Sequence, residues 1–451
     1  MFCKKLQSAE GGLFVVVKKN PKKRAAPNGT ALFFMAECSK RAPKRNIVVL
    51  SPGSFSGNSK YIYSHLHEVL AAQGLLDRLF WVTFSPKDAA ILAAAGVRVH
   101  HAANNGPTAQ LFSETAVVFV STHHTPREDF CMMQAALSHA VKVQMWHGLP
   151  AKRVAYEVAS NKKTAGAYAY FAFDCLSADY YVADSRYVAD KRREAFPAAE
   201  ILINSTPRID MLVPGAEPPR FWKLGVDSDL LDKMQSVRSK GGKVALYAPT
   251  YREGRQKKVS FFREFRELVA SAAASPETFL LIKNHPVSHD QEKLEEIVAE
   301  MEPVNVGFIE RGHDVYPYLR ETDVLITDYS SIYYDFLVTG RQVIFFRPDF
   351  EEYLMTRRIH DEQESGALLG FHPVTGEDCV AAIHAEEPAE YGENRLALKK
   401  KMFARTDGRA SRDLVAKVFR KTGSPVLAFA SPFPVMHHAR RVASWLRRRI
   451  A

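Results

Sequence analysis

Short apolar runs rich in Val and Ile alternate with amphipathic stretches along most of this chain. Such runs are typical of strands buried on both faces, and their alternation with helical stretches predicts parallel sheets covered by helices. In the first half, strands are expected at Asn46–Leu50, Leu79–Thr83, Val97–His100, Ala116–Ser121, Val141–Met145 and Tyr180–Ala183. Helices are expected between them at Lys60–Ala72, Lys87–Ala95 and Arg186–Phe196.

The same alternation restarts after a polar, Pro-rich stretch at Pro207–Pro219. Further strands are expected at Lys243–Ala248, Phe279–Lys283, Val306–Ile309, Asp323–Thr327 and Gln342–Phe346, with helices at Phe261–Ala274, Gln291–Glu300 and Ser331–Thr339. The sequence therefore predicts an α/β protein with two Rossmann-like domains, at residues 46–215 and 216–421, facing each other across a cleft. Because ligands of such sheets bind beyond the carboxyl ends of the strands, the loops there are the first candidates for chemistry.

The composition fits a globular protein and excludes several other classes. The 451 residues are 46% hydrophobic and 25% charged, so wholesale disorder is excluded. No apolar run reaches the ~18–20 residues that a membrane-spanning helix needs. The five cysteines are scattered singly, which argues against a disulfide framework or a zinc site. Residues 1–10 lack the apolar core of a secretory signal, so a cytoplasmic protein is expected.

The net charge of +11 is concentrated at the two ends of the chain. Residues 1–45 carry 11 Lys or Arg and 2 Asp or Glu, and residues 422–451 carry 5 Arg and no acidic residue. The body between them is near neutral, so a nucleic-acid groove is not implied. Basic ends instead suit an anionic membrane surface, with a solvated tail as the simpler alternative.

The two basic ends are expected to differ in structure. Residues 1–45 should form a poorly structured leader because Pro interrupts their charge runs. Residues 422–451 should form a basic amphipathic tail that lies on the inner face of the membrane. The apolar face of that tail would carry Val435, Ala439, Val442, Leu446 and Ile450.

Two loops of the first half carry candidate functional residues. Ser51–Lys60 follows the first strand, and Asn58 or Ser59 could cap the helix after it. Trp146–Pro150 (WHGLP) follows another strand and holds His147 on a tight turn. Histidine titrates near neutrality, so this side chain can accept the proton of an attacking hydroxyl. A buried histidine bonded to backbone is the alternative.

Three loops of the second half carry charged or hydroxyl side chains. They are Thr250–Glu253, Lys283–Pro286 and Thr327–Ser331. Arg252 could pair with phosphate or with the glutamate beside it. His285 lies beside a lysine, which suits an anionic ligand unless Lys283 is only a solvated strand end. Ser330 and Ser331 open a helix whose free N–H groups would bind an anion, and an ordinary serine cap is the alternative.

Together these loops indicate phosphoryl transfer to a hydroxyl, which requires a phosphate site, a proton acceptor and a proton donor. Two histidines, one from each half, would face each other across the cleft. The chain contains no Walker A sequence and no GxGxxG opening a βαβ unit, so a P-loop kinase and a dehydrogenase are poor interpretations. No organic cofactor is expected. No carboxylate-rich magnesium cluster is evident, and a divalent cation is left open.

The WHGLPAKR segment at Trp146–Arg153 resembles the WHGTPLK motif of the CDP-glycerol glycerophosphotransferases, the teichoic-acid primases and polymerases. Further segments match that family in the same order. They are FSGNSKY at Phe55–Tyr61, TPRID at Thr206–Asp210, YAPTYRE at Tyr247–Glu253, NHP at Asn284–Pro286, TDYSSIYYDF at Thr327–Phe336 and DGRASRD at Asp407–Asp413. The resemblance extends over residues 46–421.

This resemblance implies a GT-B type fold and a transferase of cell-wall, capsule or other surface-polymer synthesis. The enzyme would move a polyol phosphate, glycerol phosphate first, from a CDP-polyol to a hydroxyl of a saccharide or lipid-linked acceptor, and release CMP. The resemblance places the family's two essential histidines at His147 and His285. It assigns the nucleotide and its phosphates to Arg208, Thr250, Ser330, Ser331 and Asp335. Neighbours complete the expected substrate-binding set: Gly148, Leu149, Pro150, Arg252, Lys283 and Asn284.

The chain departs from the family pattern at two loops. Ser205 and Ile209 replace the Gly and Asn of the family's GxPRND segment, and Leu149 and Ala151 replace Thr and Leu after WHG. The polyol and the acceptor can therefore differ from those of the family. His147 is assigned as general base, and His285 would steady the transferring phosphoryl group or protonate the leaving phosphate. The main alternative is a GT-B glycosyltransferase that uses a nucleotide sugar, and a non-catalytic scaffold at the membrane surface is another.

Overall fold

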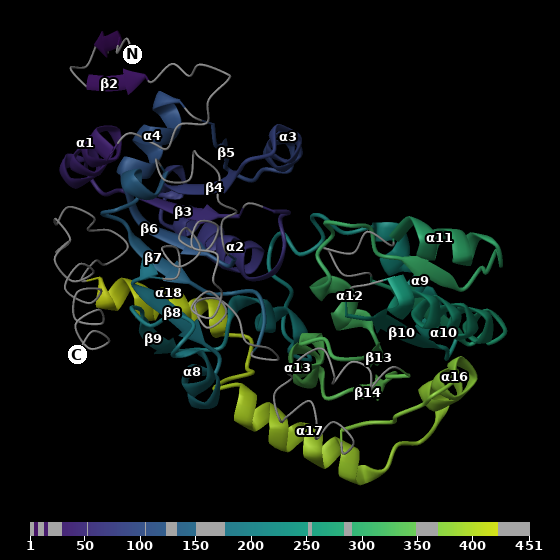
Figure 1. The fold of residues 1–451 in the computed structure, drawn as a ribbon. Helices are drawn as coiled ribbons and strands as arrows, with labels where there is room; N and C mark the ends of the chain where they lie inside the picture. Colours follow the sequence, from purple (N-terminus) through teal and green to yellow (C-terminus); the bar gives the residue numbers. More distant parts are fainter. Residues whose placement is uncertain are drawn as a thin grey trace.

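The structure is a computed structural model that describes residues 4–7, 13–16, 29–51, 53–103, 105–122, 133–149, 176–250, 255–283, 291–348 and 369–422. Its core is two parallel β-sheets, each flanked by helices (Figure 1). One sheet comes from each half of the chain. The predicted α/β class with parallel sheets is thereby confirmed.

Within the described residues, the first sheet has seven strands, all parallel. From edge to edge they are β5 (Val99–His101), β4 (Leu79–Thr83), β3 (Asn46–Leu50), β6 (Thr115–Val120), β7 (Val141–Gln144), β8 (Tyr180–Ala183) and β9 (Glu200–Ile203). The central strands β3 and β6 are buried along their whole length, which explains their unbroken apolar sequence. The sequence pattern missed β9, a short edge strand that starts with a glutamate.

The second sheet has five parallel strands among the described residues. In order they are β12 (Val306–Phe308), β11 (Thr278–Ile282), β10 (Lys243–Ala248), β13 (Val324–Thr327) and β14 (Gln342–Phe345). Each of these strands begins and ends within one residue of the range that its apolar run predicts. Strand β10 is central, so the loops that follow β10, β11 and β13 leave the same edge of the sheet.

Helices connect the strands of both sheets or follow the last strand. Those of the first half are α2 (Gly57–Ala72), α3 (Pro86–Ala94), α4 (Gly106–Ser113) and α8 (Arg186–Arg192), with a 3₁₀ turn η1 (Leu76–Arg78). Those of the second half are α9 (Ser228–Ser239), α10 (Arg255–Ala273), α11 (Gln291–Ala299), α12 (Tyr316–Glu321), α13 (Ile332–Phe336), η3 (Leu337–Thr339), α16 (Gly376–His384) and α17 (Ala389–Met402). Side-chain caps begin several of them; Ser85, for example, accepts a hydrogen bond from the Asp88 N–H at the start of α3.

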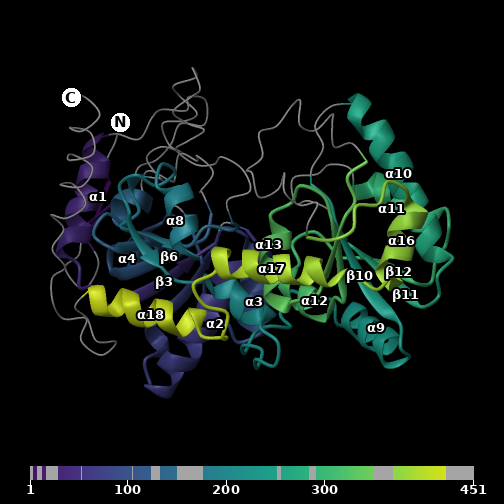
Figure 2. The same cartoon turned by 90° about the horizontal axis from the view of Figure 1, so that it is seen from below.

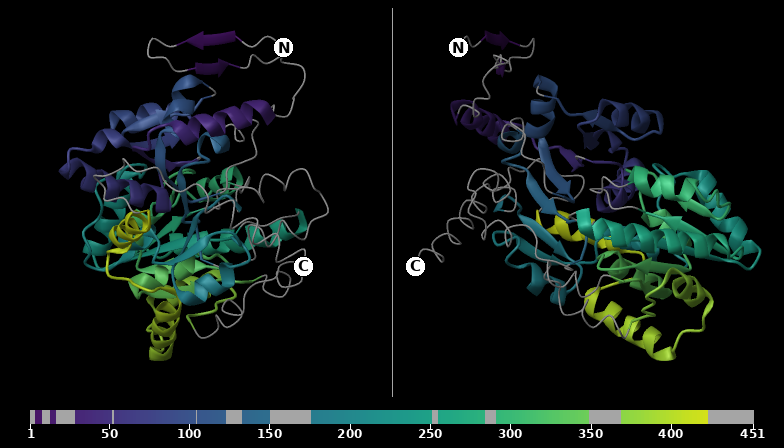
Figure 3. Two further views of the ribbon diagram at one scale, coloured as in Figure 1. Left: turned by 90° about the vertical axis from the view of Figure 1, so that its left-hand side faces the viewer. Right: turned by 45° about the vertical axis from the view of Figure 1, so that its right-hand side comes forward.

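Three segments of the basic leader that the structure describes form regular secondary structure. Strands β1 (Lys4–Gln7) and β2 (Leu13–Val16) pair antiparallel, and α1 (Gly29–Arg41) lies beside α4 (Figures 1 and 3). The prediction of a poorly structured leader is therefore wrong for residues 29–41. The charge run that suggested disorder ends this helix, where Lys and Arg interact favourably with the helix dipole.

The stretch between the two halves is part of the core and not an exposed linker. Pro207–Leu212 forms a 3₁₀ helix, η2, whose Ile209, Met211 and Leu212 are buried. These side chains belong to one hydrophobic cluster that also contains Trp146 of the first half and Leu246 of the second. Burial of apolar surface contributes about 25 cal/mol per Å², so this shared cluster holds the halves together.

The last described helix, α18 (Ala410–Lys421), returns to the first half. Helices α17 and α18 follow each other along one side of the molecule, from the second sheet to the first (Figure 2). The apolar side chains Leu414, Val415, Val418 and Phe419 pack into the core beneath β3 and α2. The expected boundary at residues 216–421 assigns α18 to the second domain, and the structure places it on the first. Within the described residues, no helix is both long and apolar enough to cross a membrane.

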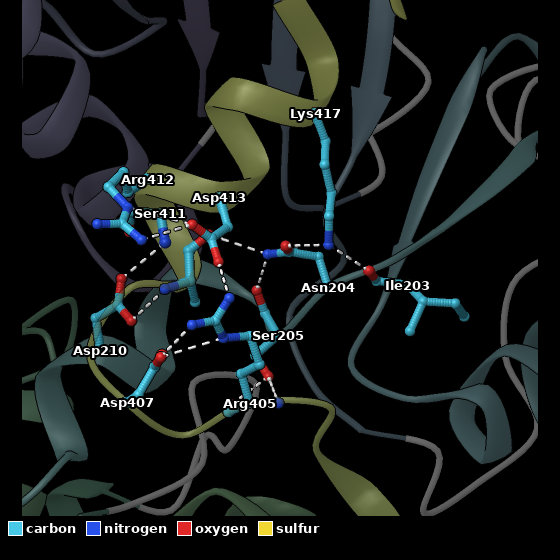
Figure 4. Close-up of polar contacts among 11 residues, drawn as sticks. Ile203, Asn204, Ser205, Asp210, Arg405, Asp407, Ser411, Arg412, Asp413 and Lys417 are labelled. Carbon is cyan, nitrogen blue, oxygen red and sulfur yellow. Dashed lines mark hydrogen bonds and ion pairs between the residues drawn. The ribbon is translucent and has the colours of Figure 1, made fainter. Parts of the chain in front are cut away.

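Asp210 of η2 caps α18 from a distant part of the chain (Figure 4). One carboxylate oxygen accepts a hydrogen bond from the Ala410 N–H at 2.7 Å, and the other from the Ser411 N–H at 2.8 Å. A negative charge is favourable at this end of a helix. The segments Thr206–Asp210 and Asp407–Asp413 therefore meet, and their contact docks α18 onto the first half.

Replacing Asp210 with Ala should lower the melting temperature and expose α18 to protease. Two buried N–H groups lose their acceptors, and loss of an N-cap costs about 0.5–2 kcal/mol. Glu300→Ala is the matched control, because it removes a half-exposed ion pair with Arg266 far from α18, worth about 0–1 kcal/mol. Thermal melts and limited proteolysis of both variants measure the difference. Equal behaviour of the two variants would show that the cap does not dock α18.

Candidate active site

The loop after β7 presents His147 at the carboxyl end of the first sheet. Trp146 before it is buried and adopts a left-handed backbone conformation with φ of 55°, whereas His147 is exposed. The Trp146 N–H donates to the Gln144 Oε1 at 2.9 Å, and the Trp146 carbonyl accepts from the Asn58 Nδ2 at 2.7 Å. The Trp146 and His147 rings lie 4.4 Å apart. An exposed histidine at this edge is accessible to an acceptor hydroxyl, as the expected general base must be, and the alternative of a buried histidine is wrong.

The Ser51–Lys60 loop does not act as the expected cap. The N-cap of α2 is Ser56, and its side chain forms no capping hydrogen bond with the described residues. Asn58 lies inside the helix and bridges two other segments, since its Oδ1 also accepts from the Arg208 N–H at 3.0 Å. Ser59 pairs with Ser121, with 2.7 Å between their hydroxyl oxygens. Asn58 precedes a helical stretch, so the local sequence suggested a cap. Its actual partners are far away in the chain and could not be recognised from that sequence.

The loop after β13 brings Ser330 and Ser331 to the corresponding edge of the second sheet. Both serines are half-buried, and Ser331 is the N-cap residue of α13. The Ser331 side chain makes no capping hydrogen bond to any residue that the structure describes. The Ser330 Oγ lies 3.5 Å from the Ile332 N, at the limit of hydrogen bonding. Neither serine therefore acts as an ordinary cap. Helix α13 is five residues long and continues directly as η3.

The loops of the two sheets touch at Gly148. A Cβ placed on this glycine would lie 3.2 Å from the Ser331 Oγ, which is closer than an ordinary van der Waals contact. Leu149 beside it is buried, in the same hydrophobic cluster as Trp146. The histidine loop of the first half and the serine loop of the second half are thus direct neighbours.

Thr250 is held by the same serine loop. Its hydroxyl and its backbone N–H both donate to Asp328, at 2.6 and 2.9 Å from the Oδ1. Arg347, after β14, donates from its Nε to the Asp328 carbonyl at 2.9 Å and lies over the rings of Tyr329 and Phe345. Burial lowers the pKa of Arg347, and Asp328 opposes that shift. Sequence reasoning missed Arg347, whose position at a strand's carboxyl end was the available signal.

Arg208 and Asp335 form an ion pair that is almost completely buried. The Arg208 Nε and Nη2 each lie 2.9 Å from one Asp335 oxygen, and the side chains are 1% and 4% exposed. Tyr316 donates to the same carboxylate at 2.7 Å. Burial acts to lower the pKa of Arg208, but Asp335 and its neighbours outweigh burial and leave that pKa above its usual value. The resemblance assigned both residues to the nucleotide, whereas here they bind each other, so contact with a ligand stays a prediction.

A second buried ion pair joins α2 to the second half. The Lys60 Nζ lies 3.0 Å from the Asp314 Oδ2 and donates to the carbonyls of Trp222 and Leu224, which connect the two halves. Tyr61 donates to the same Asp314 oxygen at 2.7 Å. Burial lowers the pKa of Lys60 against the opposing effect of Asp314. Three acceptors around one buried ammonium make this a structural contact.

Lys283 follows β11 at the edge where the serine loop also lies. Burial and then the positive charge of Arg311 lower its pKa, and Asp314 opposes them. This half-buried lysine is more than a solvated strand end, and a cation there suits an anionic ligand. Four expected site residues lie outside the described residues: Pro150, Arg252, Asn284 and His285. Among the described residues, no group of three or more His, Cys, Asp or Glu could hold a metal ion.

Comparison with known proteins finds a family model that matches most of this chain. Residues 32–420 match the family described as CDP-glycerol:poly(glycerophosphate) glycerophosphotransferase. The chain is 25% identical over 391 residues to a teichoic acid poly(glycerol phosphate) polymerase of Staphylococcus epidermidis, covering 82% of this chain and 47% of that protein. It is 28% identical over 234 residues to the teichoic acid ribitol-phosphate polymerase TarL of Staphylococcus aureus, covering 50% and 38%. The chain thus spans less than half the length of these two relatives.

The fold is similar to that of solved structures of the wall teichoic acid polymerase TagF. One of them has a TM-score of 0.62 at 20% identity, and the match covers 86% of this chain and 94% of that chain. At this identity the likeness concerns the fold alone. The family match rests on sequence and spans most of the residues, including every motif from Phe55 to Asp413. The chain belongs to the CDP-glycerol:poly(glycerophosphate) glycerophosphotransferase family.

Proposed function

We propose that this protein transfers a polyol phosphate from a CDP-activated donor to an acceptor hydroxyl and releases CMP. CDP-glycerol is the first candidate donor because the family description names it. A hydroxyl of a saccharide or lipid-linked saccharide is the proposed acceptor, in the synthesis of teichoic acid, capsule or another surface polymer. The observation that carries the proposal is the contact of the histidine loop with the serine loop at Gly148 and Ser331.

The proposed reaction is an in-line displacement at the phosphorus that bears the polyol. His147 takes the proton of the acceptor hydroxyl as its oxygen bonds to phosphorus, and the bond from phosphorus to the CMP oxygen breaks. General base catalysis of this kind contributes about 10²–10⁴-fold. His285 steadies the transferring group or protonates the departing CMP. The hydroxyls and N–H groups around Ser330 and Ser331 neutralise the developing charge, with Lys283 at the same edge.

Buried hydrogen bonds and an ion pair hold several of the expected binding residues in place. Thr250 is anchored on Asp328, and Arg208 is anchored on Asp335. These contacts hold the two loops in place, so that the residues beside them can bind the nucleotide. We place Gly148, Leu149 and Pro150 on the acceptor side, and Arg252 and Asn284 on the donor side. The basic ends would hold the molecule at the inner face of the membrane, where a lipid-linked acceptor is concentrated.

Incubation with CDP-glycerol, CDP-ribitol and UDP-sugars, with detection of CMP or UDP, tests the proposal. Release of CMP from a CDP-polyol is expected, and His147→Ala should lower that turnover by more than about 10²-fold, since base catalysis is lost. Its melting temperature should stay close to wild type because the side chain is exposed. Release of UDP alone would favour a glycosyltransferase. More than about a tenth of wild-type turnover in His147→Ala would contradict the base assignment.

Replacing Ser330 and Ser331 together with Ala should weaken CMP binding without destabilising the fold. Their hydroxyls make no strong capping bond with the described residues, so stability depends little on them. Backbone N–H groups remain at the loop, so binding should fall and not vanish. Calorimetric titration of CMP into wild type and the double variant measures this. An unchanged dissociation constant would show that neither hydroxyl faces the donor.

A chain that ends at Lys421 should keep CDP-polyol cleavage with a soluble acceptor but lose binding to anionic vesicles. Residues 423–451 lie outside the described residues, and the expectation rests on their amphipathic, Arg-rich sequence. Sedimentation with vesicles compares the truncated and full-length proteins in low salt and in ~0.5 M salt, where surface charge is screened. Equal vesicle binding by both proteins would contradict the membrane role of the tail and direct attention to residues 1–45.

A further inference from the structure

The first turn of α2 contacts both the histidine loop and the second half of the molecule. Asn58 binds the histidine loop through the Trp146 carbonyl. Lys60 and Tyr61, two and three residues later, bind Asp314. All three side chains are buried, at 2%, 0% and 1% exposure. One helical turn therefore fixes the position of the histidine loop relative to the second half.

The backbone at Trp146 needs such an anchor. A left-handed conformation costs a residue other than glycine about 1–2 kcal/mol. Such strain persists only where the surroundings enforce the conformation. Here the Gln144 Oε1 holds the Trp146 N–H, and the Asn58 Nδ2 holds its carbonyl. If the peptide after Trp146 rotated, His147 would leave its place above the tryptophan ring and beside the serine loop.

Asn58 suits this position because an amide both donates and accepts. Its Nδ2 donates to the Trp146 carbonyl at 2.7 Å, and its Oδ1 accepts from the Arg208 N–H at 3.0 Å. Arg208 in turn binds Asp335 in α13, directly after the two serines. A single buried side chain therefore lies between the loop that carries the base and the ion pair that holds α13.

We propose that Asn58 is a positioning residue of the transfer reaction, which fixes the strained Trp146 backbone and so aims His147 at the serine loop. This inference rests on the proposed function and extends it to a residue without expected contact to substrate. Displacement of a reacting group by about 1 Å can cost 10²-fold in rate. Loss of Asn58 should therefore reduce kcat. The KM for CDP-glycerol should change little, because Asn58 holds only the Arg208 backbone N–H, whereas the Arg208–Asp335 ion pair behind the serines is formed by side chains.

Asn58→Ala tests the proposal against Asn305→Ala as the matched control. Asn305 is also buried, and its Nδ2 donates to the carbonyls of Ala272, Ser275 and Thr278 near the start of β11, at the opposite edge of the second sheet. Both variants should melt earlier. At a temperature well below both transitions, Asn58→Ala should lose about 10–100-fold in kcat, with KM for CDP-glycerol changed less than threefold. Asn305→Ala should keep wild-type kcat.

Two further measurements keep the test decisive. Asn58→Asp keeps an acceptor for the Arg208 N–H but sets a carboxylate against the Trp146 carbonyl, so it should lose kcat like the Ala variant. Hydrogen exchange of residues 144–149 and of the Arg208 amide should accelerate in Asn58→Ala and not in Asn305→Ala, whether or not the protein uses CDP-glycerol. Wild type without CDP-polyol turnover would overturn the proposed function alone. Unchanged exchange, or equal loss of kcat in both Ala variants, would overturn the role of Asn58.

Discussion

The structure depends on a buried ion pair between Arg208 and Asp335 at the junction of its two halves. Two buried charges are stable only when their geometry is good and their remaining hydrogen-bonding groups have partners. Removal of one partner lowers the stability of the fold by about 3–5 kcal/mol. Here the guanidinium meets both carboxylate oxygens at 2.9 Å, Thr206 accepts a further bond from Arg208, and Tyr316 donates to Asp335. This pair specifies one orientation of α13 relative to η2, which neither the shared apolar cluster nor the sheets would specify alone.

That orientation determines which loops become neighbours. Asp335 lies in α13, directly behind Ser330 and Ser331, while the N–H of Arg208 is held by the side chain that also holds the histidine loop. The contact of Gly148 with Ser331 follows from these connections. The proposed reaction joins an acceptor hydroxyl to a phosphate, and both groups would have to come within bonding distance at the same moment. Buried charge and buried amide contacts keep the two edges together, as that reaction would need.

Several elements, and the position of the candidate base His147, could be predicted from the sequence, and other features could not. Strands β3, β6 and β10 are buried runs of apolar residues, so their ranges follow from local pattern alone. The order of strand, loop and helix also placed His147 at a carboxyl end. Strand β9 could not be predicted because it is short, lies at the edge of the sheet and begins with a glutamate. Helix α1 could not be predicted because it ends in a run of charged residues that suggested disorder. Asn58 resembled a helix cap because its partners lie 88 and 150 residues away.

The sequence by itself determined the α/β class, the family and which loops carry the candidate site residues. Apolar periodicity is a local property, and the carboxyl ends of parallel strands share one edge whatever the rest of the chain does. Only the tertiary structure decided that Arg208 binds Asp335, that Asp210 caps α18, and that Asn58 holds Trp146 in a left-handed conformation. Each of these contacts joins segments far apart in the chain. Their partners are chosen by how two sheets and their helices pack, and no local pattern of polar residues encodes that choice.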